Sequence, residues 1–324
     1  MKKTLMRLVA LGMALAMLLA ASTVVLAEEE THKLGIDLCA DDLFNQQIRE
    51  VLVEACEERG WDYMVTVNYQ DAANNVQNVQ NMITTECDYI MSYSTDIGGQ
   101  ETVRTMCEQA GVGVVFIGLE EEGYTTVGGG NYDGGYYVGT KLVEKANEIW
   151  DGQIDLVIVA EFPEVGEINT KRMGGMVDGV KASAPQLTDD QFVYVDGGLD
   201  VMKSTEAISA VLTAHPDATH ILCLCAVDDY QGMGSWNAAV AANRQDQVLI
   251  SGFHVTNPAT PGLVVQYPDT WIGQADLLGS EYAKTALAMF DDMIAGKDIV
   301  GEMRYCDYVW MDASNIGDYY EVVM

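Results

Sequence analysis

The chain has 324 residues, with 49 acidic and 17 basic side chains and a formal charge of −32 at pH 7. Binding to nucleic acid relies on clustered lysine and arginine, so this charge balance excludes a nucleic-acid partner. The seven cysteines are an odd number and lack the spacing of a small disulfide framework, which favours buried thiols over paired ones.

The N-terminus has the pattern of an export signal. Basic residues at positions 2, 3 and 7 precede an apolar run that begins at Leu8, and Ala27 is followed by three glutamates. This pattern predicts a signal peptide over residues 1–27, cleaved after Ala27. The apolar run is also about long enough for an uncleaved membrane anchor, which is the alternative. We expect export to the periplasm or the extracellular cell envelope, and a soluble monomer after cleavage.

From Lys33 onward, short apolar runs alternate with amphipathic stretches. Strands are predicted at residues 33–39, 62–69, 88–94, 113–119 and 125–130. Helices are predicted at residues 43–59, 74–84, 99–110 and 133–150. Gly60 and Gly111 stand where the first and third helices should end. The first four strands and three helices, up to residue 119, form a βαβαβαβ pattern that is typical of a parallel sheet with helices on both faces.

The same alternation then starts again. Strands are predicted at residues 154–161, 192–196, 220–226 and 248–253, and helices at 168–184, 201–214 and 229–244. Two halves of this kind predict an α/β protein with two lobes, each a parallel sheet flanked by helices. Gly128 to Gly130 are expected at the first crossing between lobes, because consecutive glycines tolerate hinge dihedrals.

Residues 248–278 hold the first candidate site. The strand at 248–253 delivers His254, after which Asn257 and Pro258 are predicted to begin a short helix. A second strand, at 270–273, ends on Gln274, and a long helix follows from about residue 276 to 295. Polar side chains at the carboxyl ends of strands in an open α/β sheet lie at its ligand crevice. His254 and Gln274 are therefore candidate ligand-binding residues.

No enzyme or cofactor pattern accompanies these elements. The glycine cluster at 128–135, GGGNYDGG, does not have the G-x-G-x-x-G spacing, and no phosphate-binding loop occurs elsewhere. Nucleophile-elbow and H-E-x-x-H motifs are absent from the sequence. Cys223 and Cys225 would point to one face of a strand, but no second cysteine or histidine pair accompanies them. We expect no catalytic residue, no cofactor and no metal site.

Several short motifs occur in a characteristic order. Phe44 follows the first strand, and it is followed by VLTAHPD at 211–217, CAVDD at 225–229, SGF at 251–253 and IGQ at 272–274. In this order the chain resembles the periplasmic sugar-binding proteins of the ribose-binding type, the substrate-capturing components of ABC transporters. The resemblance covers about residues 33–309. It implies two Rossmann-like lobes joined by a three-segment hinge, with residues 32–130 and 275–307 in one lobe and residues 131–274 and 308–324 in the other.

The resemblance also implies roles for particular residues. Phe44 matches an aromatic residue that stacks on the sugar ring, and Gln274 matches a glutamine that hydrogen-bonds the ligand at the second crossing. Asp41 lies where the family often has an asparagine that bonds sugar hydroxyls. Asp228, in the CAVDD motif, is the fourth ligand-binding residue implied in this way.

Other positions depart from the family pattern. His254 replaces an aspartate, and Thr170 replaces a binding arginine, with Arg172 half a turn further on; all three are kept as ligand-binding candidates. Val227 replaces an asparagine, Leu199 replaces an aromatic residue, and Gly118-Leu119 replaces an Asp-Arg pair. These differences argue against ribose itself as the ligand.

Each candidate also has a structural interpretation. Phe44 is followed by Ile48 and Leu52 at core spacing, and Asp41 and Asp42 are suited to cap the first helix. His254 would serve equally as a hydrogen-bonded turn residue, and Gln274 as a structural group at a strand end. The run of glutamates at 120–122 is predicted to be a solvated loop.

We conclude that the sequence favours an exported solute-binding protein. It would capture a small polar ligand, a sugar or polyol, between two lobes for the membrane permease of an ABC transporter. The alternative is a sensory module that presents the ligand to a chemoreceptor or a sensor kinase. A ligand-binding transcription factor has the same architecture, but the export signal and the acidic charge argue against it.

Overall fold

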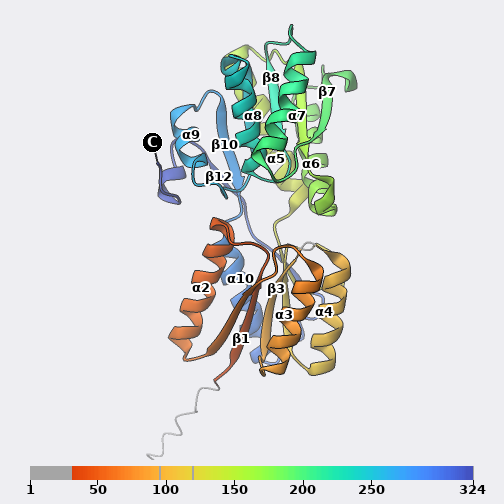
Figure 1. Ribbon diagram of the computed structural model, residues 1–324, viewed down its shortest axis with the longest axis vertical. Coiled ribbons are helices and arrows are strands. Elements are labelled where there is room, and N and C mark those ends of the chain that lie inside the picture. Colours follow the sequence, from red (N-terminus) through yellow and green to blue (C-terminus); the bar gives the residue numbers. More distant parts are fainter. Residues whose placement is uncertain (1–30, 95, 119, 324) are drawn as a thin grey trace, which may run out of the picture. The chain divides into compact units, whose positions relative to one another are not determined.

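The strands form two six-stranded sheets, each flanked by helices (Figure 1). The computed structural model describes residues 31–94, 96–118 and 120–323, and residues from His32 onward belong to one compact unit. The predicted signal peptide and the alternative membrane anchor lie outside the described residues. Within them, no helix has both the length and the apolar character needed to cross a membrane.

All neighbouring strands in the first sheet are parallel. Their order is β11 (Met303–Tyr305), β5 (Thr126–Gly128), β4 (Gly113–Ile117), β3 (Tyr89–Tyr93), β1 (Lys33–Leu38) and β2 (Asp62–Val67). The helices that pack on this sheet are α2 (Leu43–Arg59), α3 (Ala72–Thr84), α4 (Ile97–Ala110) and α10 (Gly279–Ile294).

The second sheet is parallel except at one edge, where β12 pairs with β10 in the antiparallel sense. Its order is β12 (Val309–Met311), β10 (Trp271–Asp276), β9 (Val248–Phe253), β8 (Ile221–Cys225), β6 (Leu156–Glu161) and β7 (Phe192–Asp196). Its helices are α5 (Asn131–Trp150), α6 (Glu167–Ser183), α7 (Val201–Ala214), α8 (Asp229–Ala241) and the short α9 (Thr260–Gln266). The predicted α/β fold class is confirmed.

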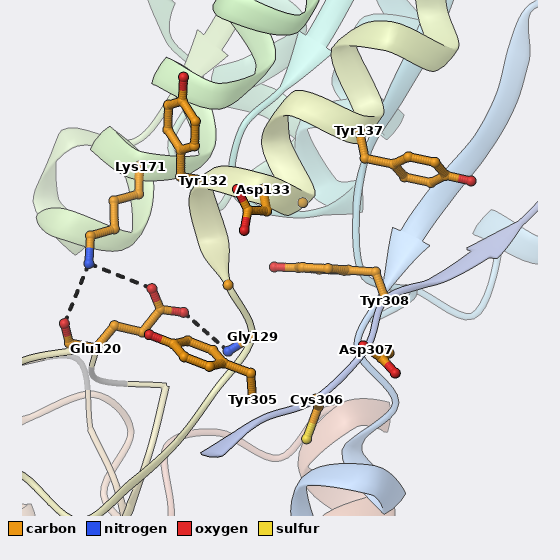
Figure 2. Close-up of a pocket in the computed structure, with 12 residues that line it drawn as sticks. Glu120, Gly129, Tyr132, Asp133, Tyr137, Lys171, Tyr305, Cys306, Asp307 and Tyr308 are labelled. Carbon is orange, nitrogen blue, oxygen red and sulfur yellow. Dashed lines mark hydrogen bonds and ion pairs between the residues drawn. The ribbon is translucent and has the colours of Figure 1, made fainter. Parts of the chain in front are cut away.

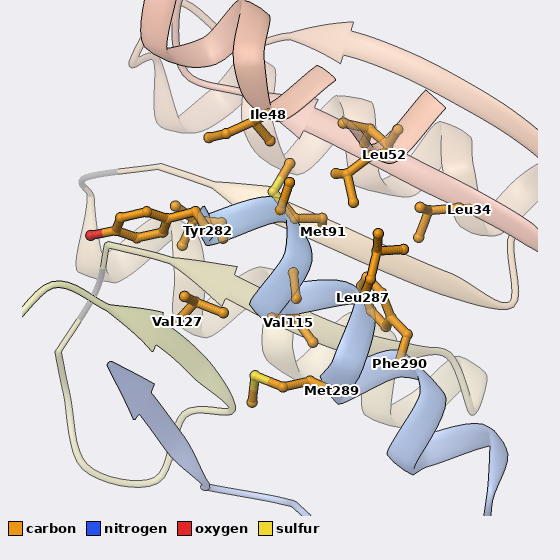
Figure 3. Packing of buried hydrophobic residues seen from close by; sticks show 14 of the residues in the cluster. Leu34, Ile48, Leu52, Met91, Val115, Val127, Tyr282, Leu287, Met289 and Phe290 are labelled. Atoms are coloured by element: carbon orange, nitrogen blue, oxygen red, sulfur yellow. The ribbon is translucent and has the colours of Figure 1, made fainter. Parts of the chain in front are cut away.

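Side chains alternate across the strands and bury both faces of each sheet. In the first sheet, Met91 packs with α2 and α10, whereas its neighbour Ile90 packs with α3 and α4. Figure 3 shows the first of these clusters, which includes Leu52 of α2 and Phe290 of α10. In the second sheet, α5 and α6 cover one face and α7 and α8 cover the other. Burial on both faces explains why these strands are almost continuously apolar.

Local sequence signals set the ends of several helices. Asp42, Asp71 and Asp96 cap α2, α3 and α4, and each accepts a hydrogen bond from the backbone N–H three residues later. Gly60 and Gly111 end α2 and α4 in the left-handed region, with φ of 66° and 71°. Part of the acidic surplus therefore has a structural role, because an aspartate at a helix N-terminus also complements the helix dipole.

The region between β9 and α10 differs from its prediction. The short helix does not begin at Asn257 and Pro258. It begins at Thr260, because the Asn257 side chain accepts from Ala259 N–H and forms a turn first. The second strand, predicted to end at Gly273, continues to Asp276, because β12 pairs along its outer edge. α10 accordingly begins at residue 279 rather than near 276.

Four glycines let α5 and α6 pack with their backbones in contact. A Cβ on Gly135 would overlap the carbonyl oxygen of Arg172, and a Cβ on Gly175 would overlap that of Tyr132. Gly139 and Gly179 extend the same contact along the helices. Asn131 of α5 and Arg172 of α6 are hydrogen-bonded to each other beside the candidate site described below. The close packing of α5 and α6 therefore fixes the position of Arg172 at this site.

We expect Gly175→Ala to lower the free energy of unfolding by about 1–3 kcal/mol, because the added methyl group must push the two helices apart. The control is Gly174→Ala on the same helix, where nothing lies within 4 Å of the added Cβ. That variant should be as stable as the wild type or up to about 1 kcal/mol more stable. Urea denaturation of both variants measures the difference. Equal stabilities would show that the helix contact is easily displaced.

Candidate functional site

A cavity of about 90 Å³ lies where strand ends of both sheets meet. Phe44 and Tyr93 reach it from the first sheet and its helices, and Asp228 and His254 from the second. The full lining is Cys39, Asp42, Phe44, Asn45, Gln70, Tyr93, Val165, Ile168, Arg172, Leu199, Val227, Asp228, His254 and Thr256. Convergence of aromatic and polar groups on one cavity is typical of a small-molecule site.

Four of the seven sequence-predicted site residues line this cavity: Phe44, Arg172, Asp228 and His254. The structure does not bring the other three to it. Asp41 is exposed and lies 4.0 Å from Arg49, and the exposed Thr170 hydroxyl donates to the Gly166 carbonyl. Gln274 is fully buried inside β10, and its amide lies 3.3 Å from the carbonyl oxygen of His254.

Phe44 belongs both to the cavity and to the core. It is 5% exposed and packs in one apolar cluster with Ile48 and Leu52. Its ring also makes edge contacts with His254 at 5.1 Å and with Tyr93 at 6.2 Å between centroids. Phe44 is therefore both a core residue and a residue that lines the cavity. A stacking role toward a ligand remains a proposal.

Arg172 is the centre of a buried hydrogen-bond network. It is 5% exposed, and each of its three nitrogens has a partner in the protein. Nε donates to Asn131 at 2.7 Å, one terminal nitrogen donates to the Val227 carbonyl at 2.7 Å, and the other lies 2.9 Å from His254 Nε2. The guanidinium also lies over the Phe253 ring, 4.3 Å from its centroid. With its donors committed, Arg172 is suited to hold other site residues in place.

The contact between Arg172 and His254 Nε2 also determines which tautomer of His254 is present. An arginine can only donate, so Nε2 of His254 accepts and the imidazole proton resides on Nδ1. Nδ1 lies 3.6 Å from Asp276, whose carboxylate also accepts from Tyr320 at 2.6 Å. Burial, followed by the charge of Arg172, lowers the pKa of His254 below its ordinary value of 6.5. The cavity therefore contains a neutral histidine at pH 7.

Burial disfavours the protonated form of His254 in the folded protein but not in the unfolded chain. As the pH falls below 6.5, the unfolded chain takes up this proton and the folded chain resists it, so the contribution of His254 to stability decreases. We expect the stability difference between wild type and His254→Gln to shrink over this range. Urea denaturation from pH 7.5 to 5 measures it, with His215→Gln as the control. A constant difference would contradict the assignment.

Two adjacent buried carboxyls follow β8. Asp229 accepts from the backbone N–H groups of Thr256 at 3.1 Å and Asn257 at 2.9 Å, and from the hydroxyls of Thr256 and Thr260. Burial nevertheless raises the pKa of Asp229 to about 6. Burial and the neighbouring Asp229 raise the pKa of Asp228 well above its usual range. Asp228 lines the cavity, where its carboxyl can bond a ligand hydroxyl.

Gln70 and Tyr93 are lining residues that the sequence analysis missed. Tyr93 ends β3, and Gln70 lies in the turn after β2 with φ of 58°. Asn68 holds this turn, because its side chain accepts from Gln70 N–H and donates to the buried Asp37 at 2.8 Å. The rule that polar groups at the carboxyl ends of strands face the ligand crevice would have found both residues.

The prediction of a solvated loop at 120–122 is wrong for Glu120, whose side chain is buried. Its side chain is 7% exposed and accepts from the backbone N–H groups of Gly129 at 3.1 Å and Asn131 at 3.2 Å. It also accepts from the Asn131 amide at 2.8 Å. Figure 2 shows its carboxylate beside Lys171, at 3.6 Å. These donors stand where the chain passes from β5 to α5, so they draw Glu120 inward. Glu122 remains exposed.

A second hollow of about 270 Å³ adjoins the first and shares Val165 and Ile168 with it. Asp96, Glu164 and Glu167 line it together with Lys171. Lys171 lies 2.7 Å from Glu167. The two hollows together make an acidic cleft. Among the described residues, no group of three or more histidine, cysteine, aspartate or glutamate side chains is placed to hold a metal ion.

The family model of the periplasmic binding protein domain matches residues 38–298. The chain belongs to this family. In this periplasmic binding protein, Cys223 and Cys225 are free cysteines buried in the core. A search of curated proteins gave no match.

Solved structures agree with this assignment at the level of the fold. An ABC transporter periplasmic solute-binding protein from Actinobacillus succinogenes, with bound D-allose, is 19% identical and superposes with a TM-score of 0.74, covering 90% of this chain and 100% of that one. A solute-binding protein from Mycobacterium smegmatis with bound glycerol is 18% identical, with a TM-score of 0.73 and coverage of 91% and 98%. The myo-inositol-binding protein of Caulobacter is 16% identical, with a TM-score of 0.71 and coverage of 92% and 98%.

Proposed function

We propose that this protein captures a small polar ligand, a sugar or polyol, outside the cytoplasm and delivers it to the permease of an ABC transporter. The observation that carries the proposal is the cavity itself, in a chain of this family. Phe44 and Tyr93 provide aromatic faces, and Asp42 and Asp228 provide hydrogen-bonding carboxyls, with each sheet contributing to the set. Aromatic faces bury the C–H surface of a sugar, and fixed polar groups bind its hydroxyls.

The proposal includes two lobes, residues 32–130 with 275–307 and residues 131–274 with 308–324. Three features of the chain support this division. β5 is followed by a helix on the other sheet, β10 is followed by α10 on the first sheet, and β11 and β12 belong to different sheets. A ligand held between two such lobes would be desolvated when they close. We propose further that the exported protein acts as a monomer.

Within the cavity, we assign direct ligand contacts to Phe44, Asp228 and His254. Arg172 is a positioning residue in this proposal, because its nitrogens are partnered by Asn131, Val227 and His254. Gln274 would act through the carbonyl of His254, which its amide approaches. Sugars and polyols are favoured as ligands because related structures hold D-allose, glycerol and myo-inositol.

A thermal-shift screen over sugars, polyols, amino sugars and nucleosides tests the proposal. A ligand at a hundred times its Kd stabilises the folded state by about 2.7 kcal/mol, which raises the melting temperature by several degrees. Asp228→Asn should weaken binding of the hit about tenfold or more, because a buried hydrogen bond is altered. The exposed Asp217→Asn is the control. Stabilisation by nucleosides alone, or chemical turnover of the hit, would contradict the proposal.

A further inference from the structure

A separate and larger cavity, of about 610 Å³, lies beside the segments that connect the two sheets (Figure 2). Gly129, Gly130 and Gly134 form part of its wall. The other lining residues are Glu120, Tyr132, Asp133, Tyr137, Lys171, Tyr305, Cys306, Asp307 and Tyr308. Of these, only Glu120 and Lys171 also line the acidic cleft.

Four tyrosines line this cavity, and three of them are exposed to solvent. The Tyr132 ring is directed away from the other rings, and its hydroxyl donates to Asp178 at 2.6 Å. Tyr132, Tyr137 and Tyr305 are 43%, 39% and 59% exposed. The fourth ring, that of Tyr308, packs over Gly134, where a Cβ would overlap it. Figure 2 shows Tyr305 and Tyr308 extending toward the same space as the carboxylate of Asp133. The tyrosines come from α5, from the end of β11 and from the β11–β12 connection, so distant parts of the chain build one aromatic site.

The charges around the cavity do not balance. Glu120 and Lys171 lie 3.6 Å apart, and Lys171 is further paired with Glu167 at 2.7 Å. Asp133 and Asp307 are exposed, and neither has an ion-pair partner among the residues that the structure describes. Two carboxylates beside exposed aromatic rings therefore remain without a neutralising cation.

We propose that this cavity, beside the connections between the sheets, is a second binding site for an organic cation with an apolar body, such as a methylated ammonium. Aromatic faces attract such a cation through their quadrupole, and carboxylates attract it by charge. Tyr137 already shows this preference, because the Lys141 ammonium lies 5.4 Å from its ring centroid. A neutral sugar would leave the charges of Asp133 and Asp307 unmatched, and a bare metal ion would make no use of the rings.

The site is independent of the proposed sugar-binding function, because it uses none of Phe44, Asp228 and His254. Its position gives it a consequence for that function. Its walls come from the end of β11 in the first sheet, from the segment after β5, and from α5, which packs on the second sheet. A cation that contacts both sides will bind differently if the sheets move relative to each other, so binding at the two sites should be coupled reciprocally.

Titration calorimetry with choline at low salt tests the site directly, with its neutral isostere 3,3-dimethylbutan-1-ol in parallel. We expect saturable choline binding with a Kd on the order of 1 mM and binding of the alcohol at least tenfold weaker. Tyr305→Ala and Asp307→Asn should each weaken choline binding by about three- to tenfold. Both residues are exposed, so these variants should fold normally.

Two control variants distinguish binding at this site from binding in the acidic cleft and from attraction of choline by the overall negative charge of the protein. Asp217→Asn removes an exposed carboxylate elsewhere, and Phe44→Ala alters the cleft; choline binding should be unchanged in both. Equal binding of choline and its neutral isostere would overturn the cation assignment. Loss of binding in Phe44→Ala with none in Tyr305→Ala would place choline in the cleft and overturn the site. Absence of saturable binding at tens of millimolar choline would also overturn it, since about 1 mM is expected.

Discussion

Replacing Arg172 with methionine will lower the free energy of unfolding by about 3–5 kcal/mol, the cost of breaking a buried charged network by removing one partner. The change leaves the Asn131 side chain, the Val227 carbonyl and the His254 ring without their donors in a region shut off from water. Ligand affinity should fall as well, because His254 and Val227 line the cavity and would no longer be held.

The matched control is Lys181→Met, on the same helix. Its side chain is 40% exposed; its ammonium pairs with the exposed Asp189 and lies 5.1 Å from the Phe192 ring centroid, so the loss should be below about 1 kcal/mol. Urea denaturation compares the two variants, and calorimetry with the screened ligand measures affinity in each. If Arg172→Met is as stable as Lys181→Met, the buried network does not organise the cavity.

Phe44→Ala is expected to affect stability and binding together. The side chain is buried in one cluster with Ile48 and Leu52, so its removal should cost about 3–5 kcal/mol of unfolding free energy. The ring also lines the cavity, and losing a stacked aromatic face should weaken ligand binding by tenfold or more. Calorimetric titration below the melting temperature of the variant measures the second effect.

Leu52→Ala separates the two contributions. Leu52 belongs to the same helix and the same cluster, but it does not line the cavity. We expect a stability loss of about 2–5 kcal/mol with unchanged affinity per folded molecule. If Phe44→Ala behaves in the same way as Leu52→Ala, Phe44 is a core residue and the ligand binds against other groups.

Features that depend on neighbouring residues in the chain were predictable from the sequence. The run of β1, α2 and β2, the cap at Asp42 and the stop at Gly60 follow from apolar periodicity and local capping chemistry. Repetition of this alternation predicted two sheets. Because strand ends in such sheets converge, the sequence also predicted His254 at the site, and the motif resemblance added Phe44, Arg172 and Asp228.

Features that depend on residues far apart in the chain were decided only by the tertiary structure. Gln274 lies inside β10 because β12, a three-residue strand with no clear pattern of its own, pairs with it. Glu120 is drawn inward by the amides of Gly129 and Asn131, although an acidic run in sequence is typical of a solvated loop. The sequence determined which segments form strands and helices, since that depends on short-range periodicity. Pairing, burial and the lining of each cavity required the folded chain, because the free energy of a polar side chain depends on the partners that folding places around it.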